Sequence, residues 1–311
     1  MSTLLDVILP VFLVIGAGWA AARARLFPDE AVDALMRYAQ NLAAPLLLFR
    51  SVATLDLAAV FDPALFLAFY AGAFAAFGAG FLGARHLFGR DLPDAVAIGF
   101  AACFSNTLLL GVPITERAYG SGALADNFAI IAVHAPILYS FGITMMETAR
   151  ARGAGLTLAR LAWQIGRSLA QQPLVIGLAA GFAVNLTGLA LPRVADAAVA
   201  MIAATAIPTA LFGLGGVLRR YRPEGDMRAI AWVVGCSLLL HPVITWGLGR
   251  ALALDLAQMR SGVLTAAMAP GVNAFLFANF YGVGKRVAAS AVLLGTAGSI
   301  LTVWFWLTVL P

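Results

Sequence analysis

The chain has 311 residues, of which 62% are apolar and 11% are charged, and its formal net charge at pH 7 is +5. Soluble domains carry about 25% charged residues, so this composition, with a mean hydropathy of +0.91, excludes a water-soluble globular fold. The excess positive charge comes from arginines in short polar connections, which gives no reason to expect a nucleic-acid partner.

Ten apolar segments follow one another along the chain. We expect a membrane helix in each, at residues 4–23, 32–53, 63–84, 95–115, 126–148, 173–190, 197–218, 228–250, 261–281 and 287–309. Segments of about 17–25 residues can cross a hydrocarbon core of ~30 Å as helices, and lipid offers free backbone groups no other partner. The sequence therefore predicts an all-α integral membrane protein with ten transmembrane helices. The first segment lacks the basic region of a cleaved signal peptide and is expected to remain as a helix.

The charges in the connections predict the orientation of these helices. The loops after the first, third, fifth, seventh and ninth helices hold 14 of the 20 Lys and Arg residues, and the other loops hold five. The positive-inside rule places the first set of loops in the cytoplasm and both termini on the outer side. The longest polar connection, 149–172, is expected to be an amphipathic cytoplasmic linker between two halves, 1–148 and 173–311. Its arginines are Arg150, Arg152, Arg160 and Arg167.

A weak internal repeat relates the two halves. When the sequence is shifted by 163 residues, the matches are Pro10 with Pro173, Gly18 with Gly181, Asp33 with Asp196, Pro45 with Pro208, and Leu48-Phe49 with Leu211-Phe212. Each half has five helices, an odd number, so the two halves must lie in opposite orientations. Inverted repeats are typical of secondary transporters, and we expect two inverted five-helix repeats.

The fourth and ninth helices carry disruptions at matching places in the two halves. The fourth reads CFSNTLLLGVPI, with Ser105, Asn106, Thr107, Gly111 and Pro113, and the ninth reads MAPGVNAFLFANFYG, with Pro270, Gly271 and Asn273. Proline removes a backbone donor, glycine tolerates unwound backbone, and the free N–H groups that start a half-helix bind anions. Asparagine amides can donate to a carboxylate or accept from a cation. We therefore expect two crossed discontinuous helices that hold a substrate near the membrane midplane.

The second helix contains a further polar pair. Gln40 and Asn41 precede Pro45, and Pro208 occupies the matching place in the seventh helix, so both prolines are expected helix breaks. The two amides either line the substrate route or hydrogen-bond between helices, and the sequence does not separate these alternatives.

Two histidines lie inside predicted helices, His134 in the fifth and His241 in the eighth. Either could be a proton relay or a satisfied interhelical hydrogen bond, and His134 is also a candidate substrate contact. The carboxylates lie mostly in loops or at helix ends, and neither H-E-x-x-H nor G-x-x-x-x-G-K-[ST] occurs. No metal or cofactor is therefore expected, and zinc hydrolysis and ATP-driven pumping by this chain are disfavoured.

Four stretches together resemble the auxin efflux carrier family, which includes plant PIN-type carriers and bacterial organic-acid permeases. They are NLAAPLLLFRSV at 41–52, SNTLLLGVPI at 105–114, IPTALFGLGGVL at 207–218 and APGVNAFLFANFYG at 269–282. With the layout of the helices, the likeness covers nearly the whole chain.

The resemblance implies a fold like that of bile-acid sodium symporters. The first two helices of each repeat would form a scaffold, and the other three would form a moving transport domain. By the same likeness, Asn106 and Asn273 would contact the substrate carboxylate, and homodimers would form through the scaffold. The chain lacks the long cytoplasmic loop of many plant members and is similar to bacterial ones, which implies a bacterial inner membrane. It also lacks the deep crossover acid of sodium-coupled relatives.

These observations favour a secondary transporter, or potential-driven carrier, of small organic anions such as auxin-like or malate/malonate-like carboxylates, with elevator-type alternating access. A ligand sensor, a channel and a sodium-coupled symporter are the alternatives. An intramembrane enzyme would need a cluster of catalytic side chains inside the membrane, and the sequence contains none.

Overall fold

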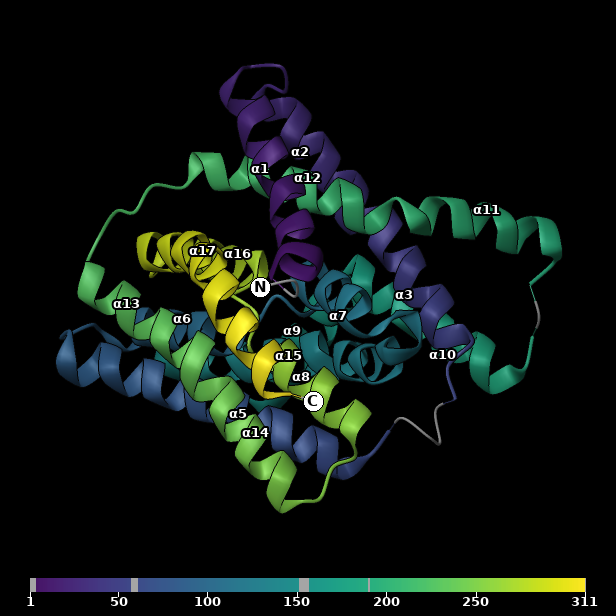
Figure 1. Ribbon diagram of the computed structural model, residues 1–311. Coiled ribbons are helices and arrows are strands. Elements are labelled where there is room, and N and C mark those ends of the chain that lie inside the picture. The colour runs from purple at the N-terminus through teal and green to yellow at the C-terminus, as the bar shows by residue number, and fades with distance from the viewer. Residues whose placement is uncertain (1–3, 57–60, 151–156, 190, 311) are drawn as a thin grey trace.

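The computed structural model describes residues 4–56, 61–150, 157–189 and 191–310. Over these residues the chain is built from helices joined by short turns, with one isolated β-bridge (Figure 1). Six helices are long and apolar enough to cross a membrane, or seven if the bent pair α9 and α10 forms one span. The described residues thus form an all-α, multi-pass membrane protein.

The first half of the chain contains the helices up to α8. Their bounds are η1 (Leu4–Ile8), α1 (Leu9–Arg23), α2 (Asp29–Tyr38), η2 (Ala39–Ala43), α3 (Ala44–Ala53), α5 (Pro63–Leu82), η3 (Gly83–Leu87), α6 (Leu92–Cys103), η4 (Thr107–Gly111), α7 (Val112–Tyr119), η5 (Ser121–Ala123) and α8 (Leu124–Arg150).

The second half contains the helices from α9 onward. Their bounds are α9 (Leu158–Ala170), α10 (Pro173–Thr187), α11 (Arg193–Ala204), α12 (Ala206–Arg220), α13 (Met227–Gly235), η6 (Cys236–Leu240), α14 (His241–Ala251), α15 (Leu256–Ala266), α16 (Val272–Tyr281) and α17 (Lys285–Val309). Helices lie within each of the ten predicted segments, but the fourth and ninth segments are each divided into short helices. The ten-span inverted repeat therefore stays a prediction.

Prolines shape several of these helices without ending them. The π-helical turns η1, η2, η4 and η6 each end two residues before a proline, namely Pro10, Pro45, Pro113 and Pro242. Proline has no N–H and its ring collides with the carbonyl four residues earlier, and a locally wider turn lets the helix continue past it. Pro45 and Pro113, which we expected at helix breaks, thus lie within continuous helical runs, and Pro208 lies in the first turn of α12.

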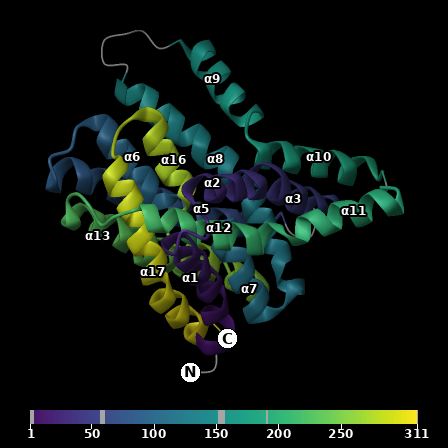
Figure 2. The same cartoon turned by 90° about the horizontal axis from the view of Figure 1, so that it is seen from above.

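The helix α9 lies at the edge of the molecule beside α8 and α10 (Figure 2). It bends by 81° from α10. Leu161 and Ile165 pack against the core, whereas Trp163 is 72% exposed. The described part of the linker is thus amphipathic, as expected, and residues 151–156 of it lie outside the described part.

The two halves pack on each other through reciprocal glycine contacts. A Cβ placed on Gly18 of α1 would lie 1.9 Å from the carbonyl oxygen of Phe212 in α12, and one placed on Gly181 of α10 would lie 2.7 Å from that of Phe49 in α3. The shift of 163 residues relates Gly18 to Gly181 and Phe49 to Phe212. Small residues let helix backbones touch, which is a main source of helix association in lipid.

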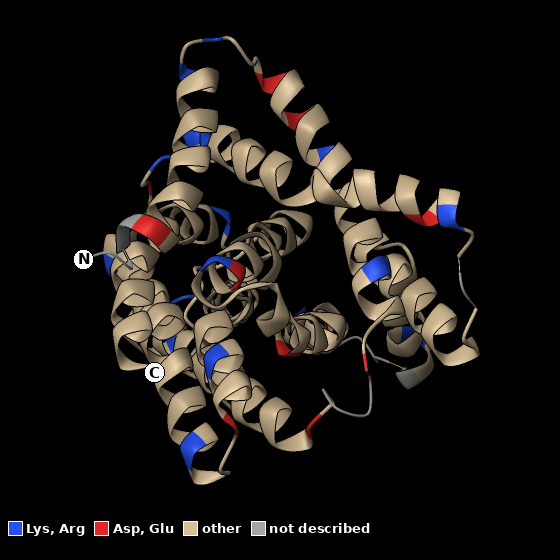
Figure 3. Cartoon of the chain, turned by 45° about the vertical axis from the view of Figure 1, so that its right-hand side comes forward, with Lys and Arg blue, Asp and Glu red and all other residues tan. Residues whose placement is uncertain are grey.

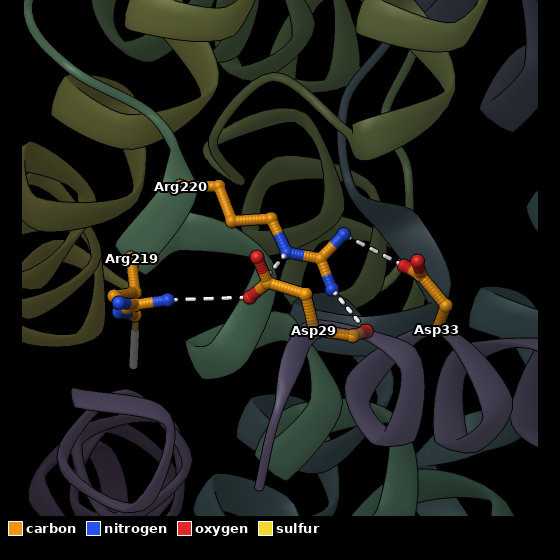
Figure 4. Close-up of polar contacts among 4 residues, drawn as sticks. All are labelled: Asp29, Asp33, Arg219 and Arg220. Atoms are coloured by element: carbon orange, nitrogen blue, oxygen red, sulfur yellow. Dashed lines mark hydrogen bonds and ion pairs between the residues drawn. The ribbon is translucent and has the colours of Figure 1, made fainter. Parts of the chain in front are cut away.

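Ion pairs join α2 to α12 at one end of each helix (Figure 4). Arg219 lies 3.2 Å from the Asp29 carboxylate, and Arg220 lies 2.7 Å from that of Asp33. The acidic pair is in the first turns of α2 and the arginines are in the last turn of α12, where each sign of charge is favoured by the helix dipole.

A further ion pair, Arg50 of α3 with Asp196 of α11 at 3.1 Å, joins the two halves where α3 ends and α11 begins. Figure 3 shows that most charged residues lie at helix ends and in connections. Exposed ion pairs contribute only about 0–1 kcal/mol each, so the close glycine contacts hold these helices together more strongly than the charges do.

Replacing Gly18 with Ala is expected to destabilise the protein by about 1–3 kcal/mol, because the new Cβ forces α1 away from α12. Thermal unfolding in detergent, followed by size-exclusion fluorescence, measures the change. Gly16→Ala in the same helix is the matched control, because no atom lies within 4 Å of its Cβ position. Equal thermal unfolding midpoints for Gly18→Ala and Gly16→Ala would contradict the close contact between α1 and α12.

Candidate substrate site

Two breaks in the helices meet inside the protein. The first, Phe104–Asn106, lies between α6 and η4, and the second, Ala267–Gly271, lies between α15 and α16. The Asn106 N–H donates to the carbonyl oxygen of Ala269 at 2.8 Å, and the Gly271 N–H donates to that of Phe104 at 2.8 Å. These bonds form an antiparallel bridge centred on Ser105 and Pro270. We call this pair of bonds the break bridge.

Local sequence explains why the chain leaves the helix at these points. Asn106 is the N-cap of the next helical run, and its side-chain oxygen accepts from the Leu109 N–H at 3.3 Å. Pro270 and extended Gly271 precede α16. Gly111 and Pro113, expected to mark the first break, lie after it, because the π-helical turn η4 accommodates the proline.

A cavity of about 310 Å³ lies beside the break bridge. This volume is at the lower end of the ~300–1,000 Å³ range of small-molecule sites. All seven side chains or backbone positions predicted to bind substrate line it, namely Asn41, Ser105, Asn106, Thr107, His134, Gly271 and Asn273. No Lys, Arg, Asp or Glu of the described residues does so.

Several polar atoms in the cavity wall have no hydrogen-bond partner in the described part of the chain. They are Ser105 Oγ, Asn106 Nδ2 and both ring nitrogens of His134. The three residues are 1%, 7% and 2% exposed. A buried polar group without a partner costs about 1–3 kcal/mol, so these atoms would gain a hydrogen bond if a small shift of the wall opened them to a ligand.

Two helical runs begin at this cavity. One begins at Thr107 and the other at Val272, and both residues line the cavity. Each helix N-terminus carries a partial charge of about +0.5, so together they offset about one negative charge. The geometry therefore suits a carboxylate better than a cation, although no basic side chain is present.

The two predicted proton-relay histidines occupy different surroundings. His134 of α8 lines the cavity, with its ring centroid 4.7 Å from that of Phe104. His241 of α14 is buried away from the lining, and its Nε2 lies 3.2 Å from the carbonyl oxygen of Phe69. His241 thus lies at hydrogen-bonding distance from a neighbouring helix, which was one of the two roles expected for it. A proton-relay role stays a prediction for both histidines.

Sequence reasoning missed two polar residues of the lining, Tyr139 and Gln172. Gln172 directly precedes Pro173, the first residue of α10, and that position at the start of an apolar helix was the one available signal. Gln40, which the sequence left open together with Asn41, also lines the cavity. Within the described residues, no three His, Cys, Asp or Glu side chains are arranged to hold a metal ion.

A buried amide holds the helices around the breaks in place. The Asn127 Nδ2 of α8 donates to Thr265 Oγ1 of α15 at 2.7 Å and to Thr115 Oγ1 of α7 at 3.3 Å. All three residues are fully buried. Asn127 therefore joins the helix after the first break to the helix before the second.

Comparison with known proteins adds a family to this geometry. A family model described as "Membrane transport protein" matches residues 3–307. The chain is 27% identical over 305 residues to a protein of Rhizobium meliloti (strain 1021) named "Putative malonate transporter", covering 97% of this chain and 94% of that protein. It is 24% identical over 311 residues to an "Uncharacterized transporter" of Methanothermobacter thermautotrophicus, covering 98% of each. The resemblance to the auxin efflux carrier family is thereby confirmed, as is the expectation of a transport protein rather than an enzyme.

The break bridge predicts slow amide hydrogen exchange at Asn106 and Gly271, although both lie outside helices. Gly295→Ala should speed this exchange, because its Cβ would lie 2.6 Å from Pro270 Cδ and push on the second break. A loss of about 1.4 kcal/mol of local stability gives about tenfold faster exchange. Gly298→Ala in the same helix meets only the flexible end of Leu238, at 3.2 Å, and is the control. Fast exchange at both amides in the parent protein would contradict the bridge.

Proposed function

The chain belongs to the membrane transport protein family, and we propose that it is a secondary transporter of small carboxylates, malate/malonate-like or auxin-like. The observation that carries the proposal is the cavity at the break bridge, where two helix N-termini and the asparagines Asn106 and Asn273 meet and no Lys or Arg of the described residues lines the wall. The relative named for malonate supports this substrate class.

In the proposed site, Asn106 and Asn273 donate to the substrate carboxylate together with the N–H groups of Val272 and Asn273 at the start of α16. Asn106 Nδ2 has no partner in the described chain, so binding would satisfy an atom that is otherwise unpaired. Ser105, Thr107, Gly271, His134 and Asn41 line the same cavity.

We also propose that the chain forms ten spans in two inverted repeats joined by the cytoplasmic linker 149–172. The reciprocal contacts of Gly18 with Phe212 and of Gly181 with Phe49 support this, because an inverted repeat relates them by a two-fold axis. The positive charge of the odd-numbered loops supports outward-facing termini in a bacterial inner membrane.

The proposed transport step is an elevator-type movement of the break-bearing helices past a scaffold. The cavity supports this division, because its wall combines Leu48 of α3 and Leu178 of α10 with the break residues. Homodimerisation through the scaffold is part of the same proposal and follows from the family likeness. One negative charge that moves outward gains about 2.3 kcal/mol per 100 mV of inside-negative potential, so export needs no coupled ion.

Import against that potential would need a coupled ion, and we propose His134 as the proton carrier. His134→Gln should then abolish malonate uptake driven by a proton gradient and leave malonate counterflow, which moves no net proton, largely intact. His241→Gln is the comparison, because His241 does not line the cavity. Gradient-driven uptake that survives His134→Gln would rule out this role.

Asn106→Ala and Asn273→Ala should each lower malonate counterflow in proteoliposomes at least tenfold, because a hydrogen bond to a charged group contributes about 1.5–3 kcal/mol. Asn279→Ala is the matched control, because Asn279 is exposed near the end of the same helix as Asn273.

Saturable counterflow distinguishes a carrier from a channel, and binding without flux would indicate a sensor. Sodium-dependent counterflow would favour the sodium-coupled alternative. If Asn106→Ala and Asn273→Ala both kept the carboxylate counterflow of the parent, the proposed binding site would be refuted.

A further inference from the structure

The cavity lining contains a second set of polar side chains, which come from outside the two breaks. Gln40 and Asn41 lie in η2, and Gln172 immediately precedes α10. All three side chains line the same cavity as Ser105 and Asn106. We call Gln40, Asn41 and Gln172 the distal amides.

The distal amides are not used to hold the protein together. Within the described residues, none of the three side chains makes a hydrogen bond, and Gln172 does not cap the helix that follows it. Gln40 and Gln172 are half-buried and Asn41 is exposed, so their amide groups can reach the cavity. Each amide offers two donors and an acceptor, and three such groups from two separate helices make a hydrogen-bonding surface.

The backbone around the distal amides is also arranged for binding. Gln40 and Asn41 lie in a π-helical turn ahead of Pro45, and such turns inside α-helices are frequent at functional sites. The 15-residue helix α10 begins at Pro173, and its first residues line the cavity. Its N-terminus adds a partial charge of about +0.5 on this side.

Apolar side chains line the rest of the cavity. They include Leu48, Leu108, Ile131 and Leu178. A ligand that matches this lining combines two polar groups with a short apolar part. A monocarboxylate would leave one polar region without a partner.

We infer that the distal amides bind the second carboxyl group of a short dicarboxylate whose first carboxylate lies at the break bridge. The inference rests on the proposed function and deepens it. The two helix N-termini at the breaks offset about one negative charge and the N-terminus of α10 about half of one. Amide hydrogen bonds therefore stabilise the remaining charge at the distal end, and Gln172 becomes a specificity-determining residue.

The test compares Gln172→Glu with Gln171→Glu. The first change keeps the size of the side chain and places a negative charge beside the distal end of the ligand. A carboxylate near a helix N-terminus is stabilising, so the variant should fold. Gln171 is exposed at the end of α9 and does not line the cavity, so the same change there is the matched control.

The readout is the dissociation constant of malonate and of monomethyl malonate, obtained from the ligand-dependent thermal stabilisation of each purified protein. Monomethyl malonate keeps one carboxylate and masks the other. The parent should bind malonate at least tenfold more tightly than the half-ester. Gln172→Glu should weaken malonate binding about tenfold or more through like-charge repulsion, with a much smaller change for the half-ester. Gln171→Glu should change neither constant.

The inference would be overturned if Gln172→Glu changed the dissociation constants of malonate and monomethyl malonate equally, or changed neither. Malonate counterflow by the parent would in that case still support the proposed function. A parent that neither exchanges nor binds any carboxylate would overturn both. A parent that binds acetate as tightly as malonate would overturn the inference alone, because the distal amides would then contribute nothing to affinity.

Discussion

The break bridge is the interaction on which the rest of this structure depends. A helix that opens inside a membrane protein exposes backbone groups, and lipid cannot satisfy them. Here each break supplies a donor and an acceptor to the other, so that Asn106 pairs with Ala269 and Gly271 pairs with Phe104. Two breaks in separate halves of the chain are thus stable only together. Their mutual satisfaction lets two helical runs, at Thr107 and Val272, begin inside the protein beside the cavity.

Much of the arrangement could be predicted from residue patterns, and the exceptions have physical causes. Hydropathy placed helices within every predicted segment, and the shift of 163 residues related Gly18 to Gly181, which then made equivalent contacts. The position of the first break was misplaced, because proline was the strongest local signal. A π-helical turn absorbs Pro113, and the break forms where Asn106 can cap the next turn and pair with the other half. That pairing is a long-range contact that no local pattern contains.

The candidate site, too, could be predicted only in part from residue patterns. The substrate candidates in the breaks could be found because asparagine is unusual in apolar helices and occurs next to glycine and proline at matching places in the two halves. Gln172 could not, because it lies in a polar connection where glutamine is ordinary. Its place at the cavity arises only when α10 packs against α3 and η2, more than one hundred residues away in the sequence. The role proposed for Gln172 therefore rests on a position that only the fold creates.

The absence of charged side chains from the described cavity lining has a consequence for the proposed transport cycle. A cation in the wall would bind an anion more tightly, but it would leave an uncompensated charge in a low-dielectric site each time the carrier returned empty. Helix N-termini and amides provide positive potential without a net charge. The empty break-bearing helices can then move without a charge in the cavity, and the loaded ones carry the charge of the substrate and of a proton bound at His134. In such a carrier the membrane potential acts on the loaded step alone, so the net charge of substrate and proton decides the direction in which the potential drives it.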